Sequence, residues 1–147
     1  MDHTDGERRP YALKAGEGWT YRLFSVDFTV KAGEVPPGSG AAIMEYTARK
    51  GEEPGQHTHP TEDEIFYVLE GKITFLCGGE RFDLEQGGFI FLPHGIPHDY
   101  TFPGDDPVRL LIVTAPVRGG SGGWGGFVSN LELGQGELIA SPSHKVS

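Results

Sequence analysis

The sequence has a single cysteine, Cys77, among its 147 residues. One thiol excludes an internal disulfide and any metal site built from several cysteines. Basic residues are also scarce, with 12 Lys and Arg against 21 Asp and Glu and a formal net charge of −9. Nucleic acids and anionic membrane surfaces are bound through clusters of basic side chains. We therefore expect neither a nucleic acid nor a membrane as partner.

Long hydrophobic runs and long helical patterns are also missing. No apolar run approaches the roughly 20 residues that cross a bilayer as a helix, and the polar residues 1–10 lack the apolar stretch of a secretory signal. A cytoplasmic location is the resulting expectation. The only helix that the pattern favours is a short one near the C-terminus, over Phe127–Leu133.

Glycine and phenylalanine are abundant instead, with 23 and 9 residues, and 11 prolines accompany them. This composition is unfavourable for long helices and suits short strands joined by turns. Turns of hairpin type are predicted at Glu70-Gly71 and at Gly78-Gly79. The spacing of these segments predicts one all-β sandwich or barrel. The predicted strands are Trp19–Val30, Ala41–Ala48, Glu64–Leu69, Lys72–Leu76, Arg81–Leu84, Phe89–Leu92, Pro97–Phe102 and Val108–Thr114.

Four stretches follow from this reading. Residues 1–10 are a polar tail, 11–117 the β domain, 118–126 a Gly-rich loop, and 127–147 the short helix with a second tail. The loop has six glycines in its nine positions. It is either a flexible connector or a flap that carries Trp124 across a pocket mouth.

Three histidines and a glutamate form the pattern that carries chemistry. His57 and His59 are two residues apart, so in an extended chain both imidazoles point to one face. Glu64 follows a polar turn that could return its carboxylate to the same place, and His98 opens a later strand after a rigid turn. Such a set suits one divalent ion of Fe, Ni, Co, Mn, Cu or Zn. By themselves these side chains could equally be ordinary solvated residues.

Neighbouring residues leave further alternatives. Glu62 or Asp63 could take the place of Glu64 if the turn were shorter. His94 is interpreted as an exposed turn residue between Pro93 and Gly95, and Cys77 as a bystander thiol.

The complete spacing resembles the two motifs of the cupin family. Gly51-x5-His57-x-His59-x4-Glu64-x6-Gly71 resembles the first motif, and Gly87-x5-Pro93-x-Gly95-x2-His98 resembles the second. The resemblance implies a double-stranded β-helix, or jelly-roll barrel, around one metal ion held by His57, His59, Glu64 and His98. The sequence departs from the family at Phe102, where the second motif usually has Asn. That Asn is not a ligand, so the departure leaves the ligand set intact and makes the wall of the barrel more apolar.

Strand alternation predicts which side chains accompany the ligands. If Glu64 points inward, so does Phe66, and if His98 does, so do Tyr100 and Phe102. These three aromatic residues would line a substrate pocket around the metal, or they would simply fill the barrel core.

The opposite face of the same strand is also apolar. Ile65, Tyr67 and Leu69 would face outward, where either a second sheet or a second copy of the chain must cover them. We expect a homodimer, in which the Trp19–Val30 strand could also add to a partner's sheet edge.

Within the family, residues 51–100 together with Gly16–Tyr21 look most like quercetinase-type single-domain cupins. That resemblance implies a metal-dependent dioxygenase acting on a flavonol or another small enol or aromatic substrate. Glu64 would then be both a ligand and the base for the substrate hydroxyl. Two other classes stay open, because fold and function separate readily. One is a non-oxidative metal enzyme, such as an isomerase, cyclase or decarboxylase, and the other is a small-molecule-binding module with a structural metal.

Overall fold

The computed structural model describes residues 10–23, 26–33, 40–59, 61–115 and 136–142. Within these ranges there is no helix, and so none that could cross a membrane. The helix predicted over Phe127–Leu133 and the Gly-rich loop with Trp124 lie outside the described residues. The strands are β1 (Trp19–Leu23), β2 (Val26–Ala32), β3 (Ala42–Ala48), β4 (Asp63–Glu70), β5 (Lys72–Cys77), β6 (Glu80–Glu85), β7 (Phe89–Leu92), β8 (His98–Thr101), β9 (Val108–Ala115) and β10 (Glu137–Ala140).

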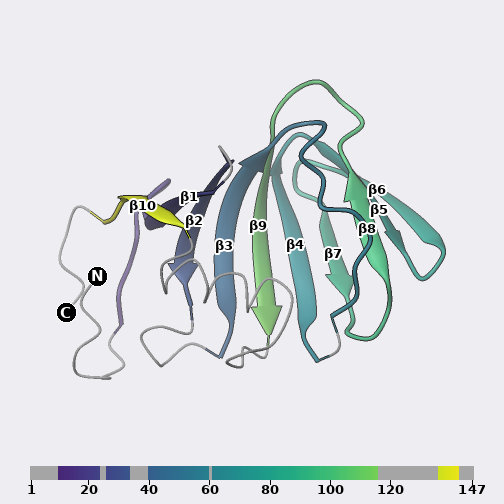
Figure 1. Cartoon of the computed structure of the whole chain (residues 1–147), viewed down its shortest axis with the longest axis horizontal. Helices are drawn as coiled ribbons and strands as arrows, with labels where there is room; N and C mark the ends of the chain where they lie inside the picture. The colour runs from purple at the N-terminus through teal and green to yellow at the C-terminus, as the bar shows by residue number, and fades with distance from the viewer. Residues whose placement is uncertain (1–9, 24–25, 34–39, 60, 116–135, 143–147) are drawn as a thin grey trace.

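The strands form two antiparallel sheets (Figure 1). The larger has the order β10-β1-β2-β3-β9-β4-β7, and the smaller has the order β6-β5-β8. Strands far apart in sequence are neighbours, since β9 lies between β3 and β4. The predicted all-β, jelly-roll architecture is confirmed.

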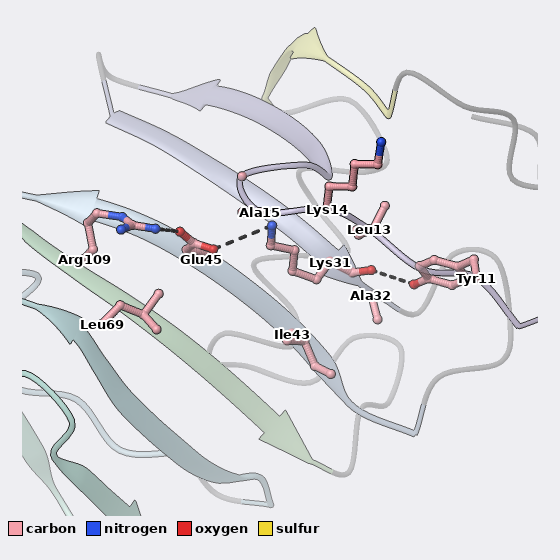
Figure 2. A pocket seen from close by; sticks show the side chains of 11 residues that line it. Tyr11, Leu13, Lys14, Ala15, Lys31, Ala32, Ile43, Glu45, Leu69 and Arg109 are labelled. Carbon is pink, nitrogen blue, oxygen red and sulfur yellow. Dashed lines mark hydrogen bonds and ion pairs between the residues drawn. The ribbon is translucent and has the colours of Figure 1, made fainter.

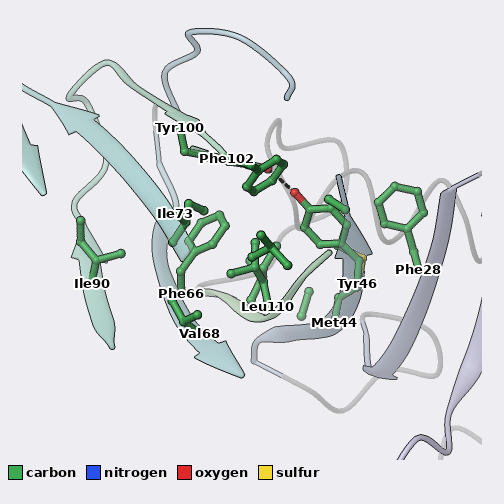
Figure 3. Close-up of a cluster of buried hydrophobic side chains, with 14 of the residues drawn as sticks. Phe28, Met44, Tyr46, Phe66, Val68, Ile73, Ile90, Tyr100, Phe102 and Leu110 are labelled. Carbon is green, nitrogen blue, oxygen red and sulfur yellow. Dashed lines mark hydrogen bonds between the residues drawn. The ribbon is translucent and has the colours of Figure 1, made fainter. Parts of the chain in front are cut away.

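The core lies between the inner faces of the two sheets (Figure 3). Leu110 of β9 is one of the side chains of this core. Along β9 every second residue is buried, as a sheet with one face toward a core requires. Aromatic rings fill the centre: Phe66 of β4 contacts Phe75 and Tyr100 of the smaller sheet, with ring centroids 5.0 and 5.4 Å apart. A hydrogen bond of 2.5 Å between the hydroxyls of Tyr46 and Tyr100 joins β3 to β8. The sheets are therefore connected by packing and, at Tyr46 and Tyr100, by a buried hydrogen bond.

The single strand predicted over Trp19–Val30 is wrong, because this segment forms the paired strands β1 and β2. Trp19 lies opposite Val30 and Leu23 opposite Val26. Apolar residues continue on both sides of the reversal, so the pattern does not reveal it. The other edge of β1 pairs with β10, in a stretch expected to be a polar tail. Both edges of β1 are thus occupied within the chain, which removes the free edge on which a partner's sheet was expected to add.

The hairpin predicted at Glu70-Gly71 is also wrong. β4 pairs with β7 and β9, whereas β5 pairs with β6 and β8, so the chain passes here from one sheet to the other. Gly71 makes this corner with a φ of +92°. A Cβ atom added to it would lie 2.9 Å from the Pro107 carbonyl oxygen and 3.0 Å from a Val108 methyl group. Both the backbone conformation and the close approach therefore require glycine.

We predict that Gly71→Ala destabilises the fold by about 2 kcal/mol or more, because it combines backbone strain with a steric clash. Gly79→Ala is the matched control: Gly79 has a φ of +84° in the β5–β6 hairpin, with nothing within 4 Å of an added Cβ. This control should lower the free energy of unfolding only by the backbone strain, about 1 kcal/mol. Urea unfolding of both variants measures the difference, and equal losses would contradict the steric argument.

Candidate metal centre

The structure brings together the four residues that the motifs single out. One nitrogen or oxygen atom from each of His57, His59, Glu64 and His98 lies within 4.8 Å of the others. Glu64 Oε1 is 3.1 Å from His98 Nε2 and 3.3 Å from His59 Nδ1. The imidazole rings are in contact, with centroids 4.5 to 5.1 Å apart.

Backbone hydrogen bonds produce this convergence. His57 and His98 form an isolated antiparallel bridge in which each N–H donates to the other's carbonyl, both at 2.9 Å. The Gly95 N–H donates to the His59 carbonyl at 2.8 Å. Glu64, near the start of β4, points inward and lies opposite Leu92 of β7. The cluster therefore forms where the segment before β4 meets the segment before β8.

Burial controls the ionisation of the cluster. Glu64 is completely buried, and His59 and His98 are 3% and 2% exposed. Burial raises the pKa of Glu64 to about 7, and the nearby Glu62 acts in the same direction, against His98. Burial also lowers the pKa of His59 to about 4, with smaller effects from His57 and His98. The pKa of the half-buried His57 is lowered for the same main reason.

Several buried polar atoms of the cluster lack hydrogen-bond partners among the described residues, as is expected where a cation binds. Among the described residues, neither carboxylate oxygen of Glu64 and neither ring nitrogen of His98 has a hydrogen bond of acceptable geometry, and His59 Nδ1 has none either. His57 Nδ1 lies 2.8 Å from the Gly55 carbonyl, which only accepts, so Nδ1 carries the proton and Nε2 keeps its lone pair. A divalent transition metal ion suits this set of imidazole nitrogens and one carboxylate. The cluster could hold one such ion per chain.

The aromatic residues expected near the ligands lie where alternation places them. Phe66 follows Glu64 by two positions on β4, and Tyr100 follows His98 by two on β8; both are buried. Phe102 is also buried, with its ring centroid 5.6 Å from that of Tyr100. These side chains pack against one another in the core, and their role as a substrate pocket stays a prediction.

The alternatives to Glu64 lie elsewhere. The Asp63 side chain points to the opposite face of β4, where its Oδ1 accepts a hydrogen bond of 2.9 Å from the backbone N–H of His94. Glu62 is buried near Glu64 without belonging to the cluster of four. His94 is exposed, as predicted for a turn residue. Burial raises the pKa of the Cys77 thiol, which disfavours the reactive thiolate.

Two inward-pointing polar residues were missed at the level of sequence. Thr114 lies opposite Glu64 on β9, and its buried hydroxyl has no hydrogen-bond partner among the described residues. Tyr46 reaches across the barrel to Tyr100. In both strands the signal was available, because each is a polar group in an otherwise apolar inward row.

Comparisons with known proteins agree with this geometry. A family model described as a cupin domain matches residues 44–114. The quercetin 2,3-dioxygenase of Bacillus subtilis is 34% identical over 113 residues, which cover 77% of this chain and 33% of that protein. The polyketide synthase protein CurC of Streptomyces cyaneus is 32% identical over 78 residues, covering 53% of this chain and 48% of that protein. The chain thus spans a third to a half of the length of these relatives.

Solved structures share the fold at low sequence identity. A predicted oxalate decarboxylase from Thermotoga maritima superposes with a TM-score of 0.64 and 20% identity, covering 72% of this chain and 99% of that one. KdgF from a Halomonas species gives a TM-score of 0.59 with 18% identity, covering 76% and 96% of the two chains. The family-model match, with which the sheet order and the His/Glu cluster agree, identifies residues 44–114 as a cupin domain.

Proposed function

We propose that the protein is a metal-dependent dioxygenase that acts on a flavonol or another small enol or aromatic substrate. The observation that carries the proposal is Glu64, a completely buried carboxylate with a pKa of about 7 beside three imidazoles. The likeness to a quercetin 2,3-dioxygenase supports it.

Glu64 has two tasks in this proposal. With His57, His59 and His98 it would hold the ion, which when bound supplies a Lewis acid and a site for substrate and dioxygen. Its carboxylate would also accept the proton of the substrate hydroxyl, since a positioned carboxylate in a site without water can act as a general base. The aromatic side chains of Phe66, Tyr100 and Phe102 would exclude water and hold the planar substrate.

A non-oxidative metal enzyme, such as an isomerase, cyclase or decarboxylase, is the second candidate. Two Streptomyces relatives, CurC and TcmJ, support it only in that they are described as polyketide synthase proteins and not as dioxygenases. The same cluster would then serve without dioxygen. A binding module with a structural metal is the third candidate, and it predicts no turnover of any enol.

We also propose that the protein is a homodimer whose interface is the outer face of the larger sheet. Cross-strand neighbours build this outer apolar face: Phe91 lies opposite Ile65, and Phe89 opposite Tyr67. The face comprises Ile43, Ile65, Tyr67, Leu69, Phe89, Phe91, Leu111 and Val113. Phe89, Phe91 and Tyr67 are 56, 50 and 42% exposed. An aromatic side chain has about 200 Å² of surface, so these three offer roughly 300 Å², more than a third of one side of a standard interface.

A shallow groove of about 540 Å³ extends the outer apolar face toward β2 (Figure 2). Ile43 and Leu69 belong to both. Four charged side chains line the groove, and three of them pair with one another, since Glu45 contacts both Lys31 and Arg109; the fourth is Lys14. The face thus presents an uncharged centre on a chain of net charge −9. A twofold-related copy of the same face is the partner that such a surface fits.

We predict that metal affinity falls at acid pH because of Glu64. The ion needs the carboxylate, and with a pKa of about 7 the metal-free site is mostly protonated at pH 6. His59, whose pKa is lowered to about 4, does not compete for protons in this range. From pH 8 to pH 6 the affinity for Co²⁺ should drop about tenfold through this group. Calorimetry in buffers of different ionisation enthalpy measures the proton released, and equal release from Glu64→Gln would contradict the assignment.

We predict that the metal-loaded protein consumes dioxygen with quercetin and that Glu64→Gln, reloaded to full metal occupancy, loses at least about 10²-fold in kcat. A neutral amide cannot accept the hydroxyl proton at any metal load. Oxygen uptake and metal analysis on the same samples provide the test. Turnover within a few-fold of the parent would remove the role as base, and conversion of an enol without oxygen uptake would favour the second candidate.

We predict a dimer mass in light scattering at micromolar concentration, and a monomer mass for the double variant Phe89→Ser, Phe91→Ser. Leu76→Ser is the matched control, because Leu76 is 46% exposed on the smaller sheet, away from the outer apolar face. It should stay dimeric. A monomeric parent protein, or a double variant that remains a dimer, would contradict the interface.

A further inference from the structure

The two segments that carry the candidate ligands are residues 57–64 and 92–98, and their described residues are tied together at four places. Three of the ties need only backbone groups or strand pairing, and many sequences could supply them. The fourth uses side chains. In chain order the ties join His57 to His98, His59 to Gly95, Asp63 to His94, and Glu64 to Leu92.

The side-chain tie is a double hydrogen bond to one carboxylate oxygen. Asp63 Oδ1 accepts the backbone N–H of His94 at 2.9 Å and lies 2.8 Å from His94 Nδ1. An ionised carboxylate only accepts, so Nδ1 carries the proton and donates it. These two bonds hold the pKa of Asp63 below its usual range, so the acceptor is ionised. Both hydrogen bonds are therefore formed when the imidazole carries a proton on Nδ1.

Exposure shows that this pair contributes little to the core. The side chains of His94 and Asp63 are 57% and 38% exposed. Exposed ion pairs and hydrogen bonds of this kind add little to fold stability. Their position is more informative: Asp63 directly precedes Glu64, and His94 lies in the turn that leads into His98. The pair thus sets how closely the turn approaches the start of β4.

We propose that Asp63 and His94 are positioning residues that hold the ligands Glu64 and His98 at metal-binding distance before the ion arrives. This inference rests on the proposed metal site. Without the pair, the turn and the start of β4 can separate, and the ion must then order them as it binds. Outer groups that orient ligands typically change metal affinity about 10- to 100-fold when they are removed.

The test is the Co²⁺ dissociation constant of His94→Ala, measured by competition with a chromophoric chelator. We expect binding to weaken about tenfold. This variant removes no negative charge. It takes away the imidazole donor to the Asp63 carboxylate and keeps the backbone N–H donor of residue 94. Electrostatics alone would then favour the cation, so the direction of the change separates positioning from charge.

Rescue by a conservative variant separates positioning from a general structural role. In His94→Asn the amide N–H occupies nearly the place of Nδ1–H, and we expect most of the affinity to return. The matched control is Asp27→Ala, which breaks a similarly exposed pair with Arg22 at 2.8 Å on β1 and β2, far from the site in the fold. Asp27→Ala should bind Co²⁺ like the parent protein.

Three outcomes would overturn the inference, and they are distinguishable. Parent-like affinity in His94→Ala rejects the positioning role and leaves the metal site intact. A loss that Asn does not rescue, accompanied by a lower Tm of the metal-free protein, assigns the pair a structural role instead. Absence of Co²⁺ binding in the parent protein rejects the proposed metal site itself.

Discussion

The antiparallel bridge between His57 and His98 is the constraint on which the candidate site depends. Its two backbone hydrogen bonds place the first ligand segment beside β8, which belongs to the smaller sheet. Glu64 comes from β4 of the larger sheet. The cluster can therefore form only where the two sheets meet.

Burial of this cluster shifts the pKa values of its acid and of its bases in opposite directions, and both shifts favour the neutral forms. It raises the pKa of Glu64 and lowers that of His59, so both groups tend toward their neutral forms. These shifts reduce the cost of burying Glu64 and His59 in an apolar core. A divalent cation reverses the balance, since it stabilises the carboxylate and takes up the lone pairs of the imidazoles. The protein alone leaves polar atoms of the site without hydrogen-bond partners, and a cation would supply the missing interactions.

The two faces of β4 meet different parts of the structure. Glu64, Phe66 and Val68 point inward to the site and the core, while Ile65 and Tyr67 point outward. A strand that is apolar on both faces needs cover on both. The smaller sheet covers the inner face, and a second copy of the chain is proposed for the outer one. Asp63, at the beginning of the same strand, pairs with His94.

The sequence by itself determined the class of fold and the members of the candidate site. Turn residues at short intervals were enough to predict strands, because turn formation is a local property of the chain. Alternation along Glu64–Leu69 and Pro97–Phe102 was enough to predict the direction of their side chains, because it is a local property of an extended chain. The spacing from Gly51 to His98 was enough to single out three histidines and Glu64.

Only the tertiary structure decided which strands are neighbours: it divided Trp19–Val30 into two strands, made Gly71 a corner between sheets, and paired β10 with β1. It also decided that Asp63 binds His94 and that Tyr46 meets Tyr100. The reason is physical, since pairing between distant segments depends on backbone hydrogen bonds that every residue but proline can make, and such bonds leave no mark on local pattern.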